Sequence, residues 1–387
     1  MQLQNFDIDV FLRDYWQQKP LLIKNAFKAW SNPLEPDELA GLACEEEVES
    51  RLITRTQLIK KDKGWKLEHG PFPESRFGKL GKKQWTLLVQ AVDHYVPEVA
   101  ALIEPFRFIP NWRIDDVMVS YAADQGGVGP HFDQYDVFLI QGLGKRRWQI
   151  GVFCDHSAEL LPHDDLRLLA NFEASSEWIL EPGDILYVPP RFAHNGVAVG
   201  DDCMTYSIGF RAPARSELIA HWCDHLLADI SDDDRYGDAH LHAQENPGEI
   251  SAQAIAALHA MVTEKMLDRD AFARWFGRYN TTRKYPDMNW QPEEPIEIDE
   301  LREFLSDGFP LCRNPASRFS FIRQDNSVLL FVDGQCFACV GETTALAEQL
   351  CAQDRIAIDL NLLKSDATIM LIATLFNQGS LAFDEDE

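Results

Sequence analysis

The order of apolar and polar positions divides this chain into three stretches. Between residues 107 and 211, short alternating or continuous apolar runs are separated by turns rich in Gly, Pro and Asp, a pattern typical of an all-β sandwich or barrel. Apolar residues then recur at helical spacing over 213–290, which predicts a helical region. After a turn-rich segment at 285–295, a helix, two or three short strands and two further helices are expected over 296–387, which predicts a small α+β domain.

Shorter signals refine this division. An amphipathic helix is expected at 8–18, because Lys19 and Pro20 end it and an apolar run follows. The glycine-rich pieces 125–129 and 142–144 are predicted to be turns, and neither opens a helix after a strand as a phosphate-binding loop would. We therefore expect three parts: a mainly β domain at 1–212, a helical region at 213–290 and a small domain at 296–387.

The net charge narrows the class of partner. The 387 residues include 36 Lys and Arg against 62 Asp and Glu, a formal charge of −26. Proteins that bind nucleic-acid phosphates or anionic membranes present a positively charged surface. Neither is therefore an expected partner, and a basic binding partner is favoured. The N-terminus carries no basic and apolar leader pattern, and the apolar stretch 367–376 is too short to span a bilayer. We therefore expect a cytoplasmic protein.

Cysteine and helical histidine spacing do not predict a metal site. Among eight scattered Cys, only Cys336 and Cys339 form a CxxC pair, without the second pair or the histidines that a zinc site needs. Buried structural thiols are the favoured interpretation. His221 and His225 lie four apart on a predicted helix, a spacing able to hold zinc. Since no third ligand is placed nearby, a polar helix face is favoured.

The sharpest local signal is a histidine and a carboxylate in the segment GPHFDQYDVF. His131 and Asp133 are two apart on a predicted strand, so both side chains leave the same face of the sheet. A barrel can bring His194, from EPGDILYVPPRFAHNG, beside them. Two histidines and one carboxylate form the facial triad of non-haem Fe(II) oxygenases, with positions left for a chelating cosubstrate and O₂. The alternative is three polar residues satisfied in turns.

An arginine on the following strand is expected to point inward. In KRRWQI, alternation places Arg146 on the same face as Trp148 and Ile150, and that face is apolar. A buried guanidinium needs an anionic partner, and its planar fork suits a carboxylate. If a 2-oxo acid chelates the metal, its far carboxylate would be this partner. The alternative is an internal ion pair with a nearby Asp.

These segments resemble the JmjC/cupin-fold 2-oxoglutarate oxygenases, in which the catalytic core is a jelly roll, or double-stranded β-helix. The resemblance extends over nearly the whole chain to the bacterial ribosomal oxygenases that hydroxylate an arginine of a large-subunit ribosomal protein. Their order of jelly roll, helical dimerisation region and winged-helix-like domain is also similar. The matching pieces are FLRDYWQQKPLLI at 11–23, VGPHFDQYDVFLIQGLGKRRW at 128–148, EPGDILYVPPRFAHNG at 181–196 and YSIGFRAP at 206–213.

The resemblance implies a cofactor set and the residues that hold it. His131, Asp133 and His194 would bind Fe(II), and Arg146 would bind the far carboxylate of 2-oxoglutarate, with a hydroxyl added by Ser120. Many relatives have Lys where this chain has Arg146, and Arg matches the bacterial subgroup. Oxygen and 2-oxoglutarate would be consumed, and succinate, CO₂ and a hydroxylated side chain would be formed.

The implied substrate is a basic large-subunit ribosomal protein, which the charge of −26 would attract. Tyr135 is predicted on the face of the metal ligands, and Asp115 or Asp116 could meet a substrate guanidinium. The alternative for the two aspartates is a solvated turn. The residues themselves do not distinguish arginine from histidine or lysine as the target, and a non-catalytic metal-binding cupin acting as a sensor or assembly factor is a further alternative.

The resemblance also implies a homodimer formed through the helical region. The winged-helix-like segment lacks the Lys and Arg cluster that DNA-binding members of that fold carry. No direct DNA contact is therefore expected, and a docking role for this domain is favoured.

Overall fold

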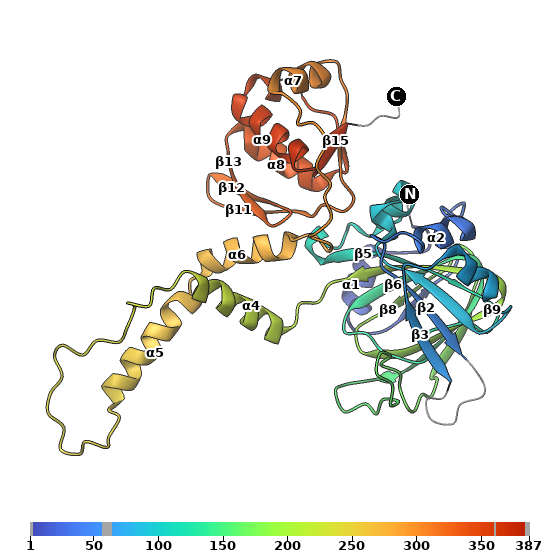
Figure 1. Ribbon diagram of the computed structural model, residues 1–387, viewed down its shortest axis with the longest axis horizontal. Helices are drawn as coiled ribbons and strands as arrows, with labels where there is room; N and C mark the ends of the chain where they lie inside the picture. Colours follow the sequence, from blue (N-terminus) through green and yellow to red (C-terminus); the bar gives the residue numbers. More distant parts are fainter. Residues whose placement is uncertain (1–2, 56–63, 360, 384–387) are drawn as a thin grey trace. The chain divides into compact units, whose positions relative to one another are not determined.

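The computed structural model describes residues 3–55, 64–359 and 361–383. Within it the chain divides into two compact units, one ending at Ala212 and one beginning at Pro213 (Figure 1). No helix in the described ranges combines the length and the apolar character needed to cross a membrane.

The N-terminal unit is built around a nine-stranded sheet whose main path runs β1-β8-β6-β9-β5-β4-β2-β3, with β7 added beside β6. Its strand pairs are antiparallel. Strands β5 to β9 lie within 107–211, where the pattern predicts a sandwich or barrel, whereas β1 to β4 lie before it and were not predicted. The strands are β1 Leu21–Ile23, β2 Ser50–Arg55, β3 Trp65–His69, β4 Trp85–Val89, β5 Ile114–Ala122, β6 Asp136–Phe153, β7 Ser176–Leu180, β8 Ile185–Val188 and β9 Phe192–Phe210.

Strands β6 and β9 are the longest, with 18 and 19 residues, and they make the jelly roll. Their register shifts on both sides of Leu143. Gly144 has a positive φ of 58°, and a Cβ on Gly142 would collide with the ring of Tyr206. The predicted turn at 142–144 is therefore wrong: the glycines bend one continuous strand, because a bulge redirects a strand without ending its pairing.

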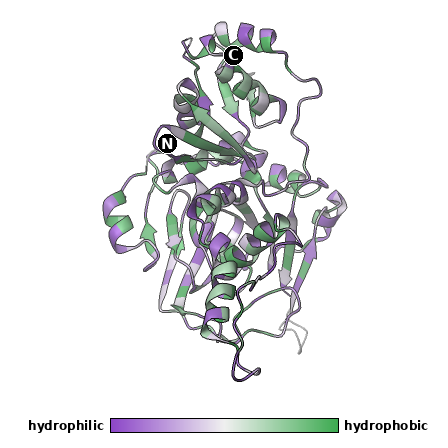
Figure 2. Ribbon diagram, turned by 90° about the vertical axis from the view of Figure 1, so that its left-hand side faces the viewer, coloured by the Kyte–Doolittle hydropathy of each residue, from purple (hydrophilic) through white to green (hydrophobic). Residues whose placement is uncertain are grey.

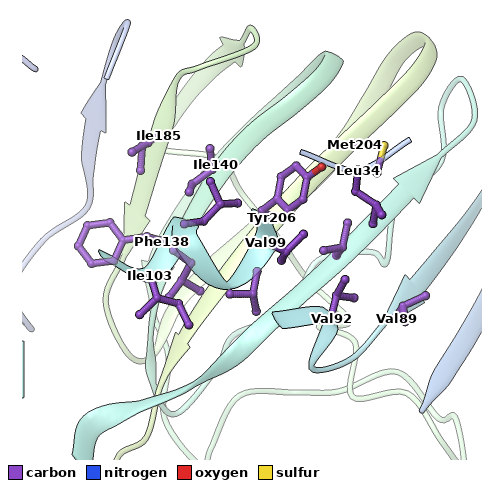
Figure 3. Packing of buried hydrophobic residues seen from close by; sticks show 14 of the residues in the cluster. Leu34, Val89, Val92, Val99, Ile103, Phe138, Ile140, Ile185, Met204 and Tyr206 are labelled. Carbon is purple, nitrogen blue, oxygen red and sulfur yellow. The ribbon is translucent and has the colours of Figure 1, made fainter. Parts of the chain in front are cut away.

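One face of the folded sheet carries the main hydrophobic core. Phe138 and Ile140 of β6, Ile185 of β8 and Tyr206 of β9 point to this side, where the N-terminal segment and the short helices between β4 and β5 cover them (Figure 3). The helices of this unit are α1 Ile8–Asp14, α2 Pro36–Leu42, α3 Pro97–Ala100 and the 3₁₀ helices η1 Glu74–Lys79, η2 Val92–His94, η3 Ala101–Phe106 and η4 Asn111–Arg113.

The opposite, inner face is different in character. Leu139, Trp148 and Ile150 form a smaller apolar cluster there, and residues of the same alternation, Gln141 and Arg146, are buried polar groups. Figure 2 shows polar and apolar positions changing along the strands. Buried polar groups require partners, so this inner face is where a bound ligand is expected.

The second unit begins with three helices in the region where helical spacing predicts them: α4 Arg215–Ala228, α5 Ala252–Met266 and α6 Arg269–Thr281. Trp222 of α4 is buried against Phe272 and Trp275 of α6. The exposed side of α5 carries Ile255 and Val262. Helical spacing thus predicts these three helices correctly. It does not explain why the apolar side chains of Ile255 and Val262 are exposed.

The remainder of this unit contains the expected three helices, α7 to α9, and the expected short strands, β11 to β13, between α7 and α8. It also contains three strands that the sequence did not predict: β10 before β11, β14 between α8 and α9, and β15 after α9. Its core is formed mainly by the inner sides of α7, α8 and α9 and by the strands. Strands β11, β12 and β13 form one antiparallel sheet, and β14, β10 and β15 form another. The elements are α7 Ile298–Ser306, β10 Leu311–Arg313, β11 Phe319–Arg323, β12 Ser327–Val332, β13 Gln335–Val340, α8 Glu342–Ala352, β14 Arg355–Ile356, η5 Leu362–Lys364, α9 Asp366–Asn377 and β15 Leu381–Phe383.

Candidate metal centre

His131 and His194 lie opposite each other across an isolated antiparallel bridge. The His131 amide donates to the His194 carbonyl at 3.0 Å, the reverse bond is 2.8 Å, and the two ring centroids are 4.2 Å apart. The predicted strand through 131–133 is wrong, because β6 begins only at Asp136. The backbone bridge, rather than strand alternation, brings the two histidines together.

Asp133 completes the group. One of its carboxylate oxygens lies 3.5 Å from Nε2 of His194 and 3.9 Å from Nε2 of His131. The amide of Arg191 donates to the Asp133 carbonyl at 2.6 Å, which fixes this part of the loop beside β9. Across the described ranges, these three side chains form the single cluster of three or more His, Cys, Asp or Glu with ligand atoms close enough for a metal ion.

Backbone carbonyls set the tautomer of both rings. Nδ1 of His131 lies 2.8 Å from the carbonyl of Gly129, and Nδ1 of His194 lies 3.0 Å from that of Phe192. A carbonyl only accepts, so Nδ1 must donate in each ring and Nε2 keeps its lone pair. Both lone pairs therefore belong to the nitrogens nearest Asp133, as metal ligation requires.

Burial lowers the pKa of His194 from 6.5 to about 4, and the neighbouring His131 adds to this effect, while Asp133 opposes it. The ring is 3% exposed and is neutral at pH 7. A neutral imidazole is the form that binds a metal.

The metal-free protein is expected to lose stability as the pH falls from 6.5 toward 4. In that range unfolded chains protonate His194 whereas the folded chain does not, so acid favours unfolding. A shift of this size is worth up to about 3 kcal/mol. The thermal midpoint of the metal-free protein, measured from pH 7 to 4.5, should fall less steeply for His194→Gln than for the unchanged chain. Equal slopes would contradict this assignment.

Arg146 points inward, as its alternation predicts, and is 3% exposed. Its Nε donates to Sγ of Cys203 at 3.4 Å and its guanidinium lies 5.7 Å from the Trp148 ring centroid, whereas Nη2 is buried without a hydrogen-bond partner. No carboxylate of the described residues pairs with it, so the alternative of an internal ion pair is wrong. A buried, unpaired guanidinium is costly, and an anionic ligand would remove that cost.

Trp148 lies between Arg146 and the metal ligands on the same side of β6. On β9, Ala198 pairs with Arg146, Gly196 with Trp148 and His194 with Ile150. A Cβ on Gly196 would collide with the Trp148 ring, and this ring is 5.9 Å from that of His194. Trp148 thus lies along β6 between the guanidinium and the two histidines.

Polar side chains surround the arginine. Ser120 of β5 is buried and pairs with Thr205 of β9, to whose carbonyl its hydroxyl donates at 3.5 Å, the outer limit of a hydrogen bond. The hydroxyl of Thr205 donates to Gln141 at 3.2 Å. The sequence analysis missed Gln141, Thr205 and Cys203, because no spacing rule selects buried polar residues that meet only through strand register.

The residues proposed to contact substrate occupy different environments. Tyr135 is 43% exposed, and burial of part of its ring, followed by the charges of Asp133 and Asp116, raises its pKa above its usual value. Asp116 is buried and accepts hydrogen bonds from the Gln90 side chain at 2.8 Å and the Ala91 amide at 2.9 Å. Asp115 and Asp116 lie on β5 at a register shift, so the alternative of a solvated turn is wrong.

The other histidine and cysteine pairs form no such site. His221 contacts the Tyr279 ring and His225 stacks on Trp222, so both lie in the aromatic packing of the helical region. Cys336 and Cys339 are free thiols. Neither pair belongs to a possible metal cluster in the part of the chain that the structure describes.

Two nitrogens and one carboxylate around a single point suit Fe(II) and leave positions for other ligands, and the unpaired Arg146 suits a carboxylate beside them. The oxygenases with a JmjC domain use such a site with Fe(II), 2-oxoglutarate and O₂. The JmjC domain family matches this chain at residues 101–218, and the ROXA-like winged helix family matches residues 264–382. The expected fold class, cofactors and reaction class are thereby confirmed.

Relatives that cover more than three quarters of this chain define the family more narrowly. The ribosomal protein uL16 3-hydroxylase of Escherichia coli K12 is 42% identical over 303 residues, covering 78% of this chain and 79% of its own. A probable ribosomal oxygenase of Haemophilus influenzae is 37% identical over 333 residues, covering 83% and 78%. The E. coli ribosomal oxygenase YcfD, solved with cobalt and 2-oxoglutarate, superposes with a TM-score of 0.84 at 35% identity, covering 99% of both chains. This chain belongs to the ribosomal oxygenase family.

Proposed function

We propose that His131, Asp133 and His194 bind Fe(II), and that Arg146, with Ser120, binds the far carboxylate of 2-oxoglutarate. The convergence of both Nε2 lone pairs and one carboxylate supports the metal assignment. The orphaned Nη2 of the buried guanidinium supports the carboxylate assignment.

Fe(II) and 2-oxoglutarate, held by these residues, would supply the oxidising chemistry, with succinate and CO₂ as products. The chain's own residues position and shield the reaction. Arg146 fixes the far end of the cosubstrate, so that its oxo acid end faces the metal. Trp148, which lies along β6 between Arg146 and the metal ligands, would line the bound cosubstrate and shield it from water. The carbonyls of Gly129 and Phe192 orient the two imidazoles by accepting from Nδ1.

We further propose that the substrate is ribosomal protein uL16 and that an arginine side chain is hydroxylated at carbon 3. Three observations support this target. The E. coli relative is a uL16 3-hydroxylase, the chain carries a charge of −26 that attracts a basic protein, and the half-exposed Tyr135 lies in the field of Asp115, Asp116 and Asp133. A neutral phenol ring among carboxylates favours a guanidinium through cation–π and charge interactions. The enzyme would act in the cytoplasm.

A peptide series tests the residue type. Overlapping uL16 fragments are incubated with the protein, Fe(II), 2-oxoglutarate and air, and succinate is measured. One fragment should stimulate succinate formation, and replacing a single arginine in it with lysine or histidine should remove the stimulation. If only replacement of a histidine or lysine removes it, the iron chemistry stands and the arginine target is wrong.

We also propose that the helical region forms a homodimer. On α5, Ile255, Leu258 and Val262 recur at helical spacing and are between 40% and 63% exposed, whereas α4 presents the exposed Ile219 and Leu227. Figure 1 shows both helices. Large apolar side chains at i, i+3 and i+7 form a stripe that a second copy can cover.

Val262→Glu is expected to dissociate this dimer. A charge at a central apolar contact costs about 2 kcal/mol or more, which weakens association roughly 30-fold. Sedimentation velocity at micromolar concentration should show the unchanged chain as a dimer and the variant as a monomer. Gln253→Glu adds the same charge to an exposed polar position of α5 and should leave the dimer intact. A dimer that persists in Val262→Glu would place the interface elsewhere.

A further inference from the structure

The inner end of the barrel contains a contact that the family chemistry does not explain. The guanidinium of Arg146 is held by a sulfur: its Nε–H donates to Sγ of Cys203 at 3.4 Å. Cys203 is fully buried. The small side chains of Ala122 and Ala198 pack around it, so no larger group competes for the guanidinium from that side.

The position of this sulfur is fixed by neighbouring strands. The amide nitrogen of Gln141 donates to the same Sγ at 3.5 Å and to the Leu143 carbonyl at 2.7 Å. The amide oxygen of Gln141 accepts from the Thr205 hydroxyl at 3.2 Å. Since each end of the Gln141 amide has its own partner, its orientation is set, and the sulfur receives two donors from fixed directions.

The chemistry of the acceptor determines what Arg146 can do. An aspartate or glutamate in the place of Cys203 would pair with the guanidinium and neutralise it. A thiol sulfur is a weak, uncharged acceptor, so it satisfies and orients Nε–H while the positive charge remains for a ligand. Nη2 is the terminal nitrogen left without a partner.

We propose that Cys203 is a positioning residue for the cosubstrate: it holds Arg146 in a fixed orientation and preserves its charge for the far carboxylate of 2-oxoglutarate. This inference rests on the proposed role of Arg146. Cys203 does not touch the cosubstrate in this account and acts only through the arginine.

The test compares Cys203→Ala, Cys203→Val and Cys203→Ser in the full chain loaded with Co(II). The dissociation constant of 2-oxoglutarate, measured by titration calorimetry, should rise about 5- to 20-fold in Ala and Val, because a buried Nε–H loses its acceptor. Ser restores an acceptor and should stay within about threefold of the unchanged chain. Val supplies no acceptor and is slightly larger than Cys, so it leaves no cavity and separates loss of the acceptor from loss of packing.

Two further readouts separate positioning from general damage. With Fe(II), the KM for 2-oxoglutarate should rise in Ala and Val in parallel with the dissociation constant, while kcat at saturating 2-oxoglutarate and the affinity for Co(II) change less than about twofold. Cys339→Ala removes the same atoms from a buried cysteine of the C-terminal unit and should leave 2-oxoglutarate binding unchanged.

Unchanged 2-oxoglutarate binding in Ala and Val would overturn the role of Cys203, as would a Ser variant no better than Ala. Arg146→Met, measured alongside, distinguishes failure of the proposed role of Cys203 from failure of the proposed role of Arg146. If Arg146→Met weakens binding and the Cys203 variants do not, only this inference fails. If Arg146→Met also leaves binding unchanged, the carboxylate assignment itself fails.

Discussion

Asp133→Ala and His131→Ala proteins should fail to bind stoichiometric Fe(II) and should form no succinate above background. Each variant removes one of the three proposed ligands, whose donor atoms all lie within 4.8 Å of one another. Loss of an outer-shell partner of a metal ligand already costs roughly 10- to 100-fold in affinity or activity, so loss of a ligand itself should exceed that range. Metal content after dialysis and succinate formation measure the two effects.

A matched control keeps this result specific. His240→Ala changes an exposed histidine of the second unit and should retain both metal and activity. The fold of the ligand variants is checked by circular dichroism and by comparing their sedimentation coefficient with that of the unchanged chain. An Asp133→Ala protein that binds Fe(II) as tightly as the unchanged chain would remove Asp133 from the metal site.

Arg146→Met should raise the dissociation constant for 2-oxoglutarate by a factor of roughly 30 to several thousand, while Fe(II) binding is retained. The guanidinium is buried without a counter-ion, so it supplies a charged partner in a water-excluded place. Removing one member of a buried pair of opposite charges costs about 2–5 kcal/mol of binding free energy. Each 1.4 kcal/mol changes the dissociation constant about tenfold. Titration of the Co(II)-loaded protein with 2-oxoglutarate measures the change.

The neighbouring arginine provides the comparison. Arg147 lies on the opposite face of β6 by strand alternation and is partly exposed, so Arg147→Met should leave 2-oxoglutarate binding within about threefold. Arg146→Lys keeps the charge but not the planar fork, and its affinity should fall between those of the unchanged chain and Arg146→Met. Equal losses in Arg146→Met and Arg147→Met would indicate a disturbed sheet rather than a carboxylate contact.

Strand periodicity was sufficient to predict where Arg146 points. Trp148 and Ile150 identify the buried face of β6, and a two-residue repeat assigns Arg146 to it, as the structure confirms. The helices α4 to α9 were predictable for the same kind of reason, because their apolar residues recur at helical spacing. Local periodicity thus predicts faces and elements well.

Local periodicity does not predict which residues of distant segments contact each other. The HxD segment was placed on a strand, but His131 is held by a single backbone bridge to His194, an interaction between residues 63 positions apart in sequence number. The contacts of Cys203 depend on the register between β6 and β9, which shifts on both sides of Leu143. A bulge of this kind changes which side chains face each other. The buried polar residues that contact Cys203 can therefore be identified only from the three-dimensional structure.

The most direct test of the account is mass spectrometry of ribosomal proteins from cells that lack this gene. The proteins are incubated with the purified chain, Fe(II), 2-oxoglutarate and ¹⁸O₂, with His131→Ala run in parallel. The account predicts one added oxygen-18 on carbon 3 of one arginine of uL16, absent with the variant. Label on a different residue type, or on no ribosomal protein while the enzyme retains iron and 2-oxoglutarate, would contradict the proposed substrate.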